Sequence, residues 1–327
     1  MKKFLFGILA VAILSMSACK KDDPVDTGKA GPVTITFTVD KNVVTYHATA
    51  ENAVSYVWDL ANGETPSGQD VTGTYLFPGK YTVKCTAKGR DEDSQATVDV
   101  DVAEGDPDIF NEVNVALSGY NSTTGESEAV WVWATVEGTM GDGPRESVPD
   151  TVYFNPIDFS WWQSGDGDLP EDGLDDEYSF KLNEKMEYIN DFKTAFMVNW
   201  AWAASRGYAL PGIWEDVAYE AYEAPQASWS VEHIENINDT LTFETNINGT
   251  MKSGAYVIHL TNNASIGMES TGYDYQILKL TADTLWIRYD NTFPEDLGNY
   301  YDPDVLESEG AVPGDPDEAY LKLVRKK

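Results

Sequence analysis

The sequence predicts an all-β protein that consists of a small β-sandwich followed by a larger, aromatic-rich β-sandwich. Apolar and polar residues alternate in many short runs, and this two-residue period is typical of strands that bury one face. Turn residues such as Gly, Pro and Asn separate the runs. Long stretches of helical period are absent from the sequence, and residues 214–222 are compatible with a short helical turn at most.

Residues 1–18 predict a lipoprotein signal peptide. Lys2 and Lys3 form a basic start, and the apolar run that follows over residues 4–14 is too short to span a bilayer stably. The small residues before Cys19 resemble a bacterial lipobox, which implies cleavage before Cys19 and attachment of lipid to its thiol. An ordinary signal peptide followed by an incidental cysteine is the alternative.

Residues 19–31 are expected to hold the lipidated cysteine and a flexible tether, because the segment is polar and contains Pro and Gly. The Lys-Lys-Asp-Asp stretch at residues 20–23 resembles the acidic export signal of Bacteroidetes lipoproteins. This resemblance implies a lipoprotein of the outer membrane that is exposed on the cell surface. We therefore expect the chain to contact the membrane through its lipid anchor.

The formal net charge of −33 restricts the partners of the chain. Binding to nucleic acid requires a basic face, so that nucleic acid is not an expected partner. Anionic polysaccharides and anionic lipid surfaces are disfavoured for the same reason. Hydrophobic residues make up 42% of the chain, which is enough to bury a core and argues against an acidic disordered protein.

Residues 32–104 are predicted to form the small sandwich. Alternating apolar residues over 56–60 predict a strand, and Asn62-Gly63 predicts a tight turn because both residues tolerate positive φ. Together with Pro-Gly-Lys-Tyr-Thr-Val at residues 78–83, these features resemble the polycystic-kidney-disease (PKD) domain. The resemblance implies a rigid Ig-like spacer. Cys85 falls on an alternating strand and is expected to be a small buried core residue.

Residues 107–327 are predicted to form the larger β-sandwich, which is jelly-roll-like, with a lipocalin-like barrel as the alternative. This part of the chain holds nine of the ten tryptophans. The predicted strands lie at residues 130–136, 178–182, 241–245, 255–260, 275–280, 285–289 and 320–324.

Tryptophans of this second part are the predicted ligand-binding residues. Sugar rings stack their C–H faces on aromatic rings, while carboxylates and amides bind sugar hydroxyls. Successive side chains of a strand point to opposite faces, so that one of the adjacent Trp161 and Trp162 is expected to be exposed, while the tryptophans of the Trp-x-Trp pairs share a face. The predicted glycan-binding residues are Trp161, Trp162, Trp131, Trp133, Trp200, Trp202 and Trp214. Packing in a hydrophobic core is the alternative for each.

Several motifs of the second part together resemble the C-terminal module of PKD-containing lipoproteins of Bacteroidetes. They are Trp-Val-Trp at 131–133, Gly-Thr-Met-Gly-Asp-Gly-Pro at 138–144, Gly-Leu-Asp-Asp-Glu-Tyr-Ser-Phe at 173–180 and the segment 275–285. The resemblance implies a surface glycan-binding protein that acts beside an outer-membrane glycan transporter. Combined with the net charge, it predicts capture of a neutral polysaccharide such as a β-glucan without catalysis.

Three alternatives to simple glycan binding stay open at this stage. No cofactor is expected, but the acidic run that contains Asp166, Asp168, Asp175 and Asp176 could bind calcium, which prefers six or more oxygen ligands. A glycoside hydrolase would need two carboxylates on opposite sides of the bond, and the abundance of acids is no sign of such a pair. A protein-interaction or adhesion module would use the tryptophans as a partner interface.

Overall fold

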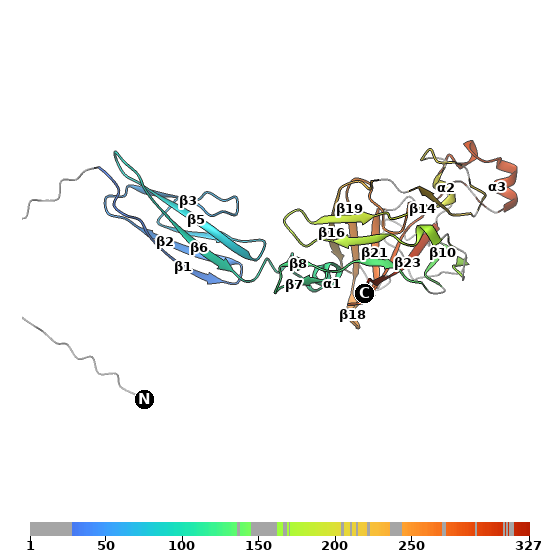
Figure 1. Ribbon diagram of the computed structural model, residues 1–327, viewed down its shortest axis with the longest axis horizontal. Coiled ribbons are helices and arrows are strands. Elements are labelled where there is room, and N and C mark those ends of the chain that lie inside the picture. Colours follow the sequence, from blue (N-terminus) through green and yellow to red (C-terminus); the bar gives the residue numbers. More distant parts are fainter. Residues whose placement is uncertain are drawn as a thin grey trace, which may run out of the picture. The chain divides into compact units, whose positions relative to one another are not determined.

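The computed structural model describes residues 28–135, 138–144, 162–165, 169, 171–203, 206–209, 211–213, 215–220, 223–235, 244–269, 273–291, 293–309, 311, 313 and 317–327. The chain forms two compact units. The first consists of the residues up to Tyr75 and of Gly79–Val102, and the second consists of Leu76–Pro78 and of the residues from Ala103 onward. Both units consist mainly of strands (Figure 1). The described residues contain no helix that is long and apolar enough to cross a membrane.

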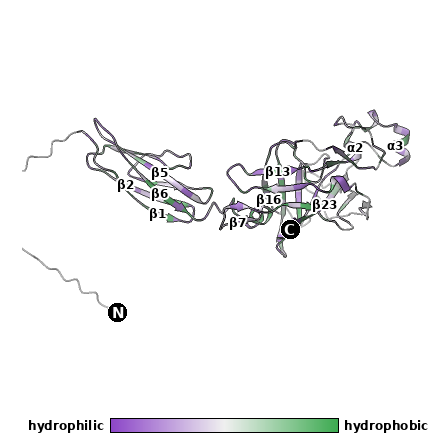
Figure 2. Cartoon of the chain, in the orientation of Figure 1, coloured by the Kyte–Doolittle hydropathy of each residue, from purple (hydrophilic) through white to green (hydrophobic). Residues whose placement is uncertain are grey.

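The first unit is a sandwich of two antiparallel three-stranded sheets. One sheet has the order β1 (Thr34–Asp40), β2 (Val43–Thr49), β4 (Asp70–Thr74), and the other has the order β3 (Ser55–Asp59), β5 (Gly79–Lys88), β6 (Ser94–Val102). Hydrophobic and hydrophilic residues are interspersed along these strands (Figure 2), as expected of strands that bury one face.

The core of the first unit contains a buried chain of hydrogen bonds. The hydroxyls of Tyr46 and Tyr75 are 2.6 Å apart, and the Tyr75 hydroxyl donates to the carbonyl oxygen of Leu60 at 2.9 Å. Cys85 is fully buried beside them, as expected. These polar groups therefore satisfy one another inside an otherwise apolar core.

The turn predicted at Asn62-Gly63 forms with a different backbone. Positive φ falls on Ala61 (59°) and Gly63 (90°), not on Asn62. The Asn62 side chain instead donates to the carbonyl oxygen of Thr74 at 3.0 Å and accepts from the backbone N–H of Glu64 at 3.0 Å. Asparagine thus stabilises the turn through its amide group.

The strands of the second unit pair into a closed ring. The ring strands are β9 (Trp131–Trp133), β12 (Glu177–Phe180), β13 (Glu187–Asp191), β16 (Ala227–Ile234), β19 (Ala255–Leu260), β21 (Asp274–Leu280), β22 (Thr284–Asp290) and β23 (Asp317–Arg325). Each pairs antiparallel with the next, and β23 pairs with β9 to close the circle. The all-β class with a larger sandwich-like second unit is confirmed, and the ring closure corresponds to the barrel that the sequence left as an alternative.

Shorter elements extend or cover this ring. β10 (Met140–Pro144) pairs with β23 and with β11 (Trp162–Gln163), while β17 (Glu244–Ile247) pairs with β18 (Thr250–Ser253) and with β21. A hairpin joins β7 (Tyr120–Asn121) to β8 (Glu126–Ser127). The helical pieces are α1 (Glu112–Ser118), η1 (Glu171–Gly173), α2 (Trp200–Ala203), η2 (Leu297–Asn299) and α3 (Pro303–Glu309).

Hydrophobic side chains fill the inside of the ring as far as the described residues show. Buried side chains from all eight ring strands belong to one hydrophobic cluster, which also includes Leu117 of α1. A small sheet with the order β15 (Val217–Glu220), β14 (Ala195–Val198), β20 (Met268–Glu269) contributes Met197 and Met268 to the same cluster. The core of the second unit therefore spans the ring, α1 and the small sheet.

Candidate functional site

Two of the predicted glycan-binding tryptophans lie inside the ring. Trp131 and Trp133 share one face of β9, as expected, but that face is the interior one, and their exposed fractions are 0% and 2%. The Trp131 indole N–H donates to the carbonyl oxygen of Leu117 at 2.8 Å, and that of Trp133 donates to the Tyr178 hydroxyl at 3.1 Å. Because a sugar can stack only on an accessible ring, the prediction of ligand contacts for Trp131 and Trp133 is corrected to a core role.

Trp200 and Trp202 do not share a face. Both belong to the short helix α2, where residues two apart point to nearly opposite sides. Trp200 is 2% exposed and packs edge-on against Phe293 and Tyr301, with ring centroids 5.4 and 5.7 Å apart. Trp200 is therefore a core residue rather than a ligand residue, whereas Trp202 is half-buried and packs against two hydrophobic clusters.

The remaining predicted site residues lie outside the described structure. These are Cys19, Trp161, Trp214, Asp166 and Asp168, together with the side chain of Trp162, whose backbone belongs to β11.

Half-buried aromatic residues gather beside the small sheet β15-β14-β20, and we call this group the aromatic surface. Its members are Phe192, Trp202, Tyr208, Tyr219 and Tyr273. They come from separate segments of the chain, and each keeps part of its side chain accessible to solvent.

A buried phenylalanine of β14 supports the aromatic surface. Phe196 is 1% exposed, and its ring centroid lies 5.2 Å from that of Phe192, 5.6 Å from Tyr208 and 6.2 Å from Tyr219. Tyr208 and Tyr219 stack on each other at 4.7 Å with an angle of 26° between their planes. The Tyr219 hydroxyl donates to the carbonyl oxygen of Ala209 at 2.5 Å, which ties the loop to β15. The rings are therefore held in fixed positions.

Arg206 links the other two rings of the aromatic surface. Its guanidinium carbon lies 5.7 Å from the ring centroid of Trp202 and 5.8 Å from that of Tyr273, both within the range of cation–π attraction. The guanidinium also donates to the Tyr273 hydroxyl. Arg206 thus holds together rings that are 71 residues apart in the sequence.

A buried carboxylate accompanies this arginine. Glu269 of β20 places one oxygen 3.9 Å from an Arg206 guanidinium nitrogen, and the same oxygen accepts a hydrogen bond from the Tyr208 hydroxyl at 3.4 Å. Burial, together with the negative charge of Glu269, raises the pKa of Tyr208 to about 12. The aromatic surface therefore combines accessible rings with charged and hydroxyl groups that can form hydrogen bonds.

Sequence reasoning found one member of this surface, Trp202, and missed the others. The tyrosines lie in three short segments whose proximity depends on the pairing of β14 with β15 and β20. The one local signal was the pair Arg206 and Tyr208, which follows Trp202 closely.

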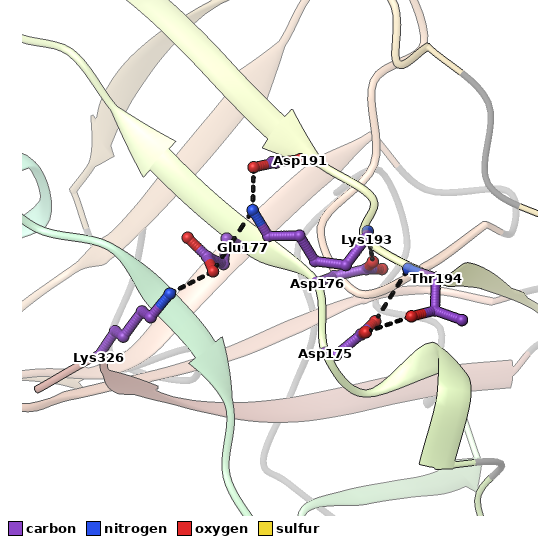
Figure 3. Close-up of polar contacts among 7 residues, drawn as sticks. All are labelled: Asp175, Asp176, Glu177, Asp191, Lys193, Thr194 and Lys326. Atoms are coloured by element: carbon purple, nitrogen blue, oxygen red, sulfur yellow. Dashed lines mark hydrogen bonds and ion pairs between the residues drawn. The ribbon is translucent and has the colours of Figure 1, made fainter.

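The acidic segment around Asp175 and Asp176 makes protein contacts (Figure 3). Asp175 accepts hydrogen bonds from the hydroxyl and the backbone N–H of Thr194, at 2.7 and 3.4 Å. Lys193 forms ion pairs with Asp191 and Glu177, and Lys326 forms one with Glu177. Among the described residues, no group of three or more Asp, Glu, His or Cys side chains is placed to hold a metal ion.

Asp176 is the buried member of this segment. Its side chain is inaccessible to solvent, and its two oxygens accept long hydrogen bonds of 3.3 Å from the Lys193 backbone N–H and from the Tyr178 hydroxyl. Burial raises the pKa of Asp176 to about 7, an effect that these two hydrogen bonds reduce and that the nearby charges of Asp175 and Asp191 increase. The carboxyl group therefore titrates near neutral pH.

Comparison with known proteins identifies the first unit. The family model of the PKD domain matches residues 26–102. Residues 26–102 are a PKD domain. The resemblance seen in the sequence is thereby confirmed for this part of the chain, and no curated protein matches the chain.

Solved structures of PKD domains are similar to the same part of the chain. The PKD1 domain of the Vibrio cholerae metalloprotease PrtV is 25% identical, with 23% of this chain and 94% of that domain covered and a TM-score of 0.21. The PKD domain of the human receptor SorCS2 is 16% identical over 32% of this chain and 98% of that domain, with a TM-score of 0.19.

A third solved structure is similar over most of the chain. A carbohydrate-binding module of the β-sandwich superfamily is 11% identical over 90% of this chain and 92% of that module, with a TM-score of 0.20.

Proposed function

We propose that this chain is a surface glycan-binding protein that captures a neutral polysaccharide, such as a β-glucan, without catalysis. In this proposal a lipid on Cys19 anchors the chain in the outer membrane, and the PKD domain acts as a spacer. The bound polymer would be passed to an outer-membrane glycan transporter. The aromatic surface is the observation that carries the proposal.

The chemistry of the aromatic surface suits a sugar chain. The half-buried side chains of Trp202, Tyr208, Tyr219 and Tyr273 would contact the C–H groups of pyranose rings through the parts that stay accessible. Hydroxyl groups of the tyrosines, and the charged groups between them, provide donors and acceptors for sugar hydroxyls. Because the rings are already positioned by Phe196 and Arg206, binding would not require them to be ordered again.

Anchoring would compensate for weak binding by a single surface. A tethered protein raises the local concentration of its ligand near other proteins of the same membrane. The net charge of −33 favours neutral glycans over polymers of uronic acids. Trp161, Trp162 and Trp214 stay predicted ligand residues.

Affinity electrophoresis of the chain from Lys20 onward tests the proposal, in gels that contain mixed-linkage β-glucan, xyloglucan or no polymer. We expect retardation by a neutral polymer and its loss in Trp202→Ala. Phe37→Ala is the matched control, because Phe37 is an accessible aromatic residue of the PKD domain, 37% exposed, and should not contribute. If neutral polymers leave the migration of the wild-type chain unchanged, while a partner protein is bound through Trp202, the aromatic surface is a protein interface instead.

A further inference from the structure

We infer that Glu269 sets the charge preference of the aromatic surface, because it neutralises Arg206 and so leaves the surface suited to uncharged glycans. This inference rests on the proposed function, since it concerns the ligand class of the same site. In this inference a single residue, Glu269, disfavours acidic sugars at the site, whereas the proposed function attributed that effect to the net charge of the whole chain.

The two charged groups form a half-buried pair within the surface. The Arg206 side chain is 24% exposed and that of Glu269 is 8% exposed, with 3.9 Å between the nearest nitrogen and oxygen. The Arg206 side chain is thus the more accessible member of the pair. Its guanidinium lies over the rings of both Trp202 and Tyr273, so that a ligand bound to these rings would lie close to the charged pair.

The backbone fixes the position of the carboxylate. Glu269 pairs with Val198 in the parallel register of β20 and β14, and its carbonyl oxygen accepts the backbone N–H of Asn199 at 3.0 Å. The Tyr208 hydroxyl holds the side chain from the other direction at 3.4 Å. Glu269 is therefore a rigid counter-charge rather than a flexible surface residue.

An arginine between aromatic rings would otherwise favour an anionic ligand. A guanidinium binds carboxylates strongly, and partial burial strengthens that attraction because water screens it less. With Glu269 beside it, the pair has no net charge, and an incoming uronate would be repelled by the same carboxylate.

Replacing Glu269 with Gln should reverse the preference. The substitution keeps the size of the side chain and an acceptor for the Tyr208 hydroxyl, but it removes the negative charge beside Arg206. In affinity gels with polygalacturonate, we expect E269Q to be retarded at an about tenfold lower polymer concentration than the wild-type chain. A factor of about ten corresponds to one new contact between Arg206 and a carboxylate of the polymer. Added salt should reduce this retardation.

Two further variants separate the role of the pair from that of charge in general. Glu220→Gln removes the same charge from β15, which β14 separates from β20, and should leave migration in polygalacturonate unchanged. The double variant R206M/E269Q should lose the gain of E269Q. Circular dichroism and thermal unfolding of each variant show whether it is folded as the wild type is.

The outcomes distinguish this inference from the proposed function. Equal migration of folded E269Q and wild type in polygalacturonate would overturn the role of Glu269, even if the wild type binds a neutral glucan. A gain in E220Q as large as that in E269Q would also overturn it, since net charge alone would then explain the preference. Failure of the wild type to bind any neutral polymer would instead refute the proposed function.

Discussion

Replacing Asp176 with Asn should stabilise the second unit at and above pH 7 and have little effect at pH 4. The carboxyl group is fully buried, and its pKa is raised from the ordinary value of 3.8 to about 7. A group with a raised pKa binds its proton more tightly in the folded state than in the unfolded state. Its contribution to stability is therefore fully present below pH 3.8 and is lost as the pH rises to about 7.

The size of this loss follows from the shift in pKa. About three pKa units correspond to roughly 4 kcal/mol of folding free energy, which the wild type loses between acidic and neutral pH. Asn cannot ionise, so that D176N keeps this free energy at high pH. One side of the Asn amide is an N–H donor in place of a carboxylate acceptor, so that the Tyr178 hydroxyl must turn to accept from it. This rearrangement offsets part of the gain, and we expect the free energy of unfolding of D176N to exceed that of the wild type by about 2–4 kcal/mol at pH 8.

Denaturant unfolding of both chains at pH 4, 6 and 8, followed by tryptophan fluorescence, measures this difference. The second unit holds nine of the ten tryptophans, so that its transition dominates the signal. Asp175→Asn is the control, because Asp175 is exposed and should change stability by less than about 1 kcal/mol. A difference between D176N and wild type that is the same at pH 4 and pH 8 would refute the reasoning.

Three predictions concern the core and the turns of the PKD domain. Tyr75→Phe should lower the free energy of unfolding by about 1–2 kcal/mol, because the carbonyl oxygen of Leu60 loses its buried donor; a midpoint in urea equal to that of the wild type would contradict this. Gly89→Ala should cost about 1–3 kcal/mol, because a Cβ there would lie 2.2 Å from the carbonyl oxygen of Glu92, and thermal unfolding should show an earlier first transition. Cys85 is fully buried and burial raises the pKa of its thiol to about 11, so that a thiol reagent should label the chain from Lys20 onward only after denaturation; rapid labelling of the native chain would exclude a buried thiol.

Strands of this protein could be predicted because their signal is local. Alternation of apolar and polar residues within a few positions predicts a buried face, and the predicted strand at 255–260 coincides with β19. The closure of the ring could not be predicted with the same certainty. β9 pairs with β12 through the single residue pair Trp131 and Tyr178. These residues are far apart in the sequence, so that no tight turn between them indicates that their strands pair.

The candidate site was harder to predict than the strands. For Trp131 and Trp133 the shared face was correct, but alternation does not tell which face of a strand points to the core. For Trp200 and Trp202 the assumed period was wrong, since a four-residue helix is too short to show a helical pattern in the sequence. The tyrosines and Arg206 join Trp202 only through long-range strand pairing, which no local pattern reveals.

The position of β23 has a consequence for biosynthesis. This strand pairs with β22 on one side and with β9 and β10 on the other, so that it completes the ring, and it is translated after every other strand that it joins. A nascent chain that has not yet released these residues leaves β9, β10 and β22 without their shared neighbour and keeps open edges. We therefore expect folding of the second unit to be delayed until translation has passed β23.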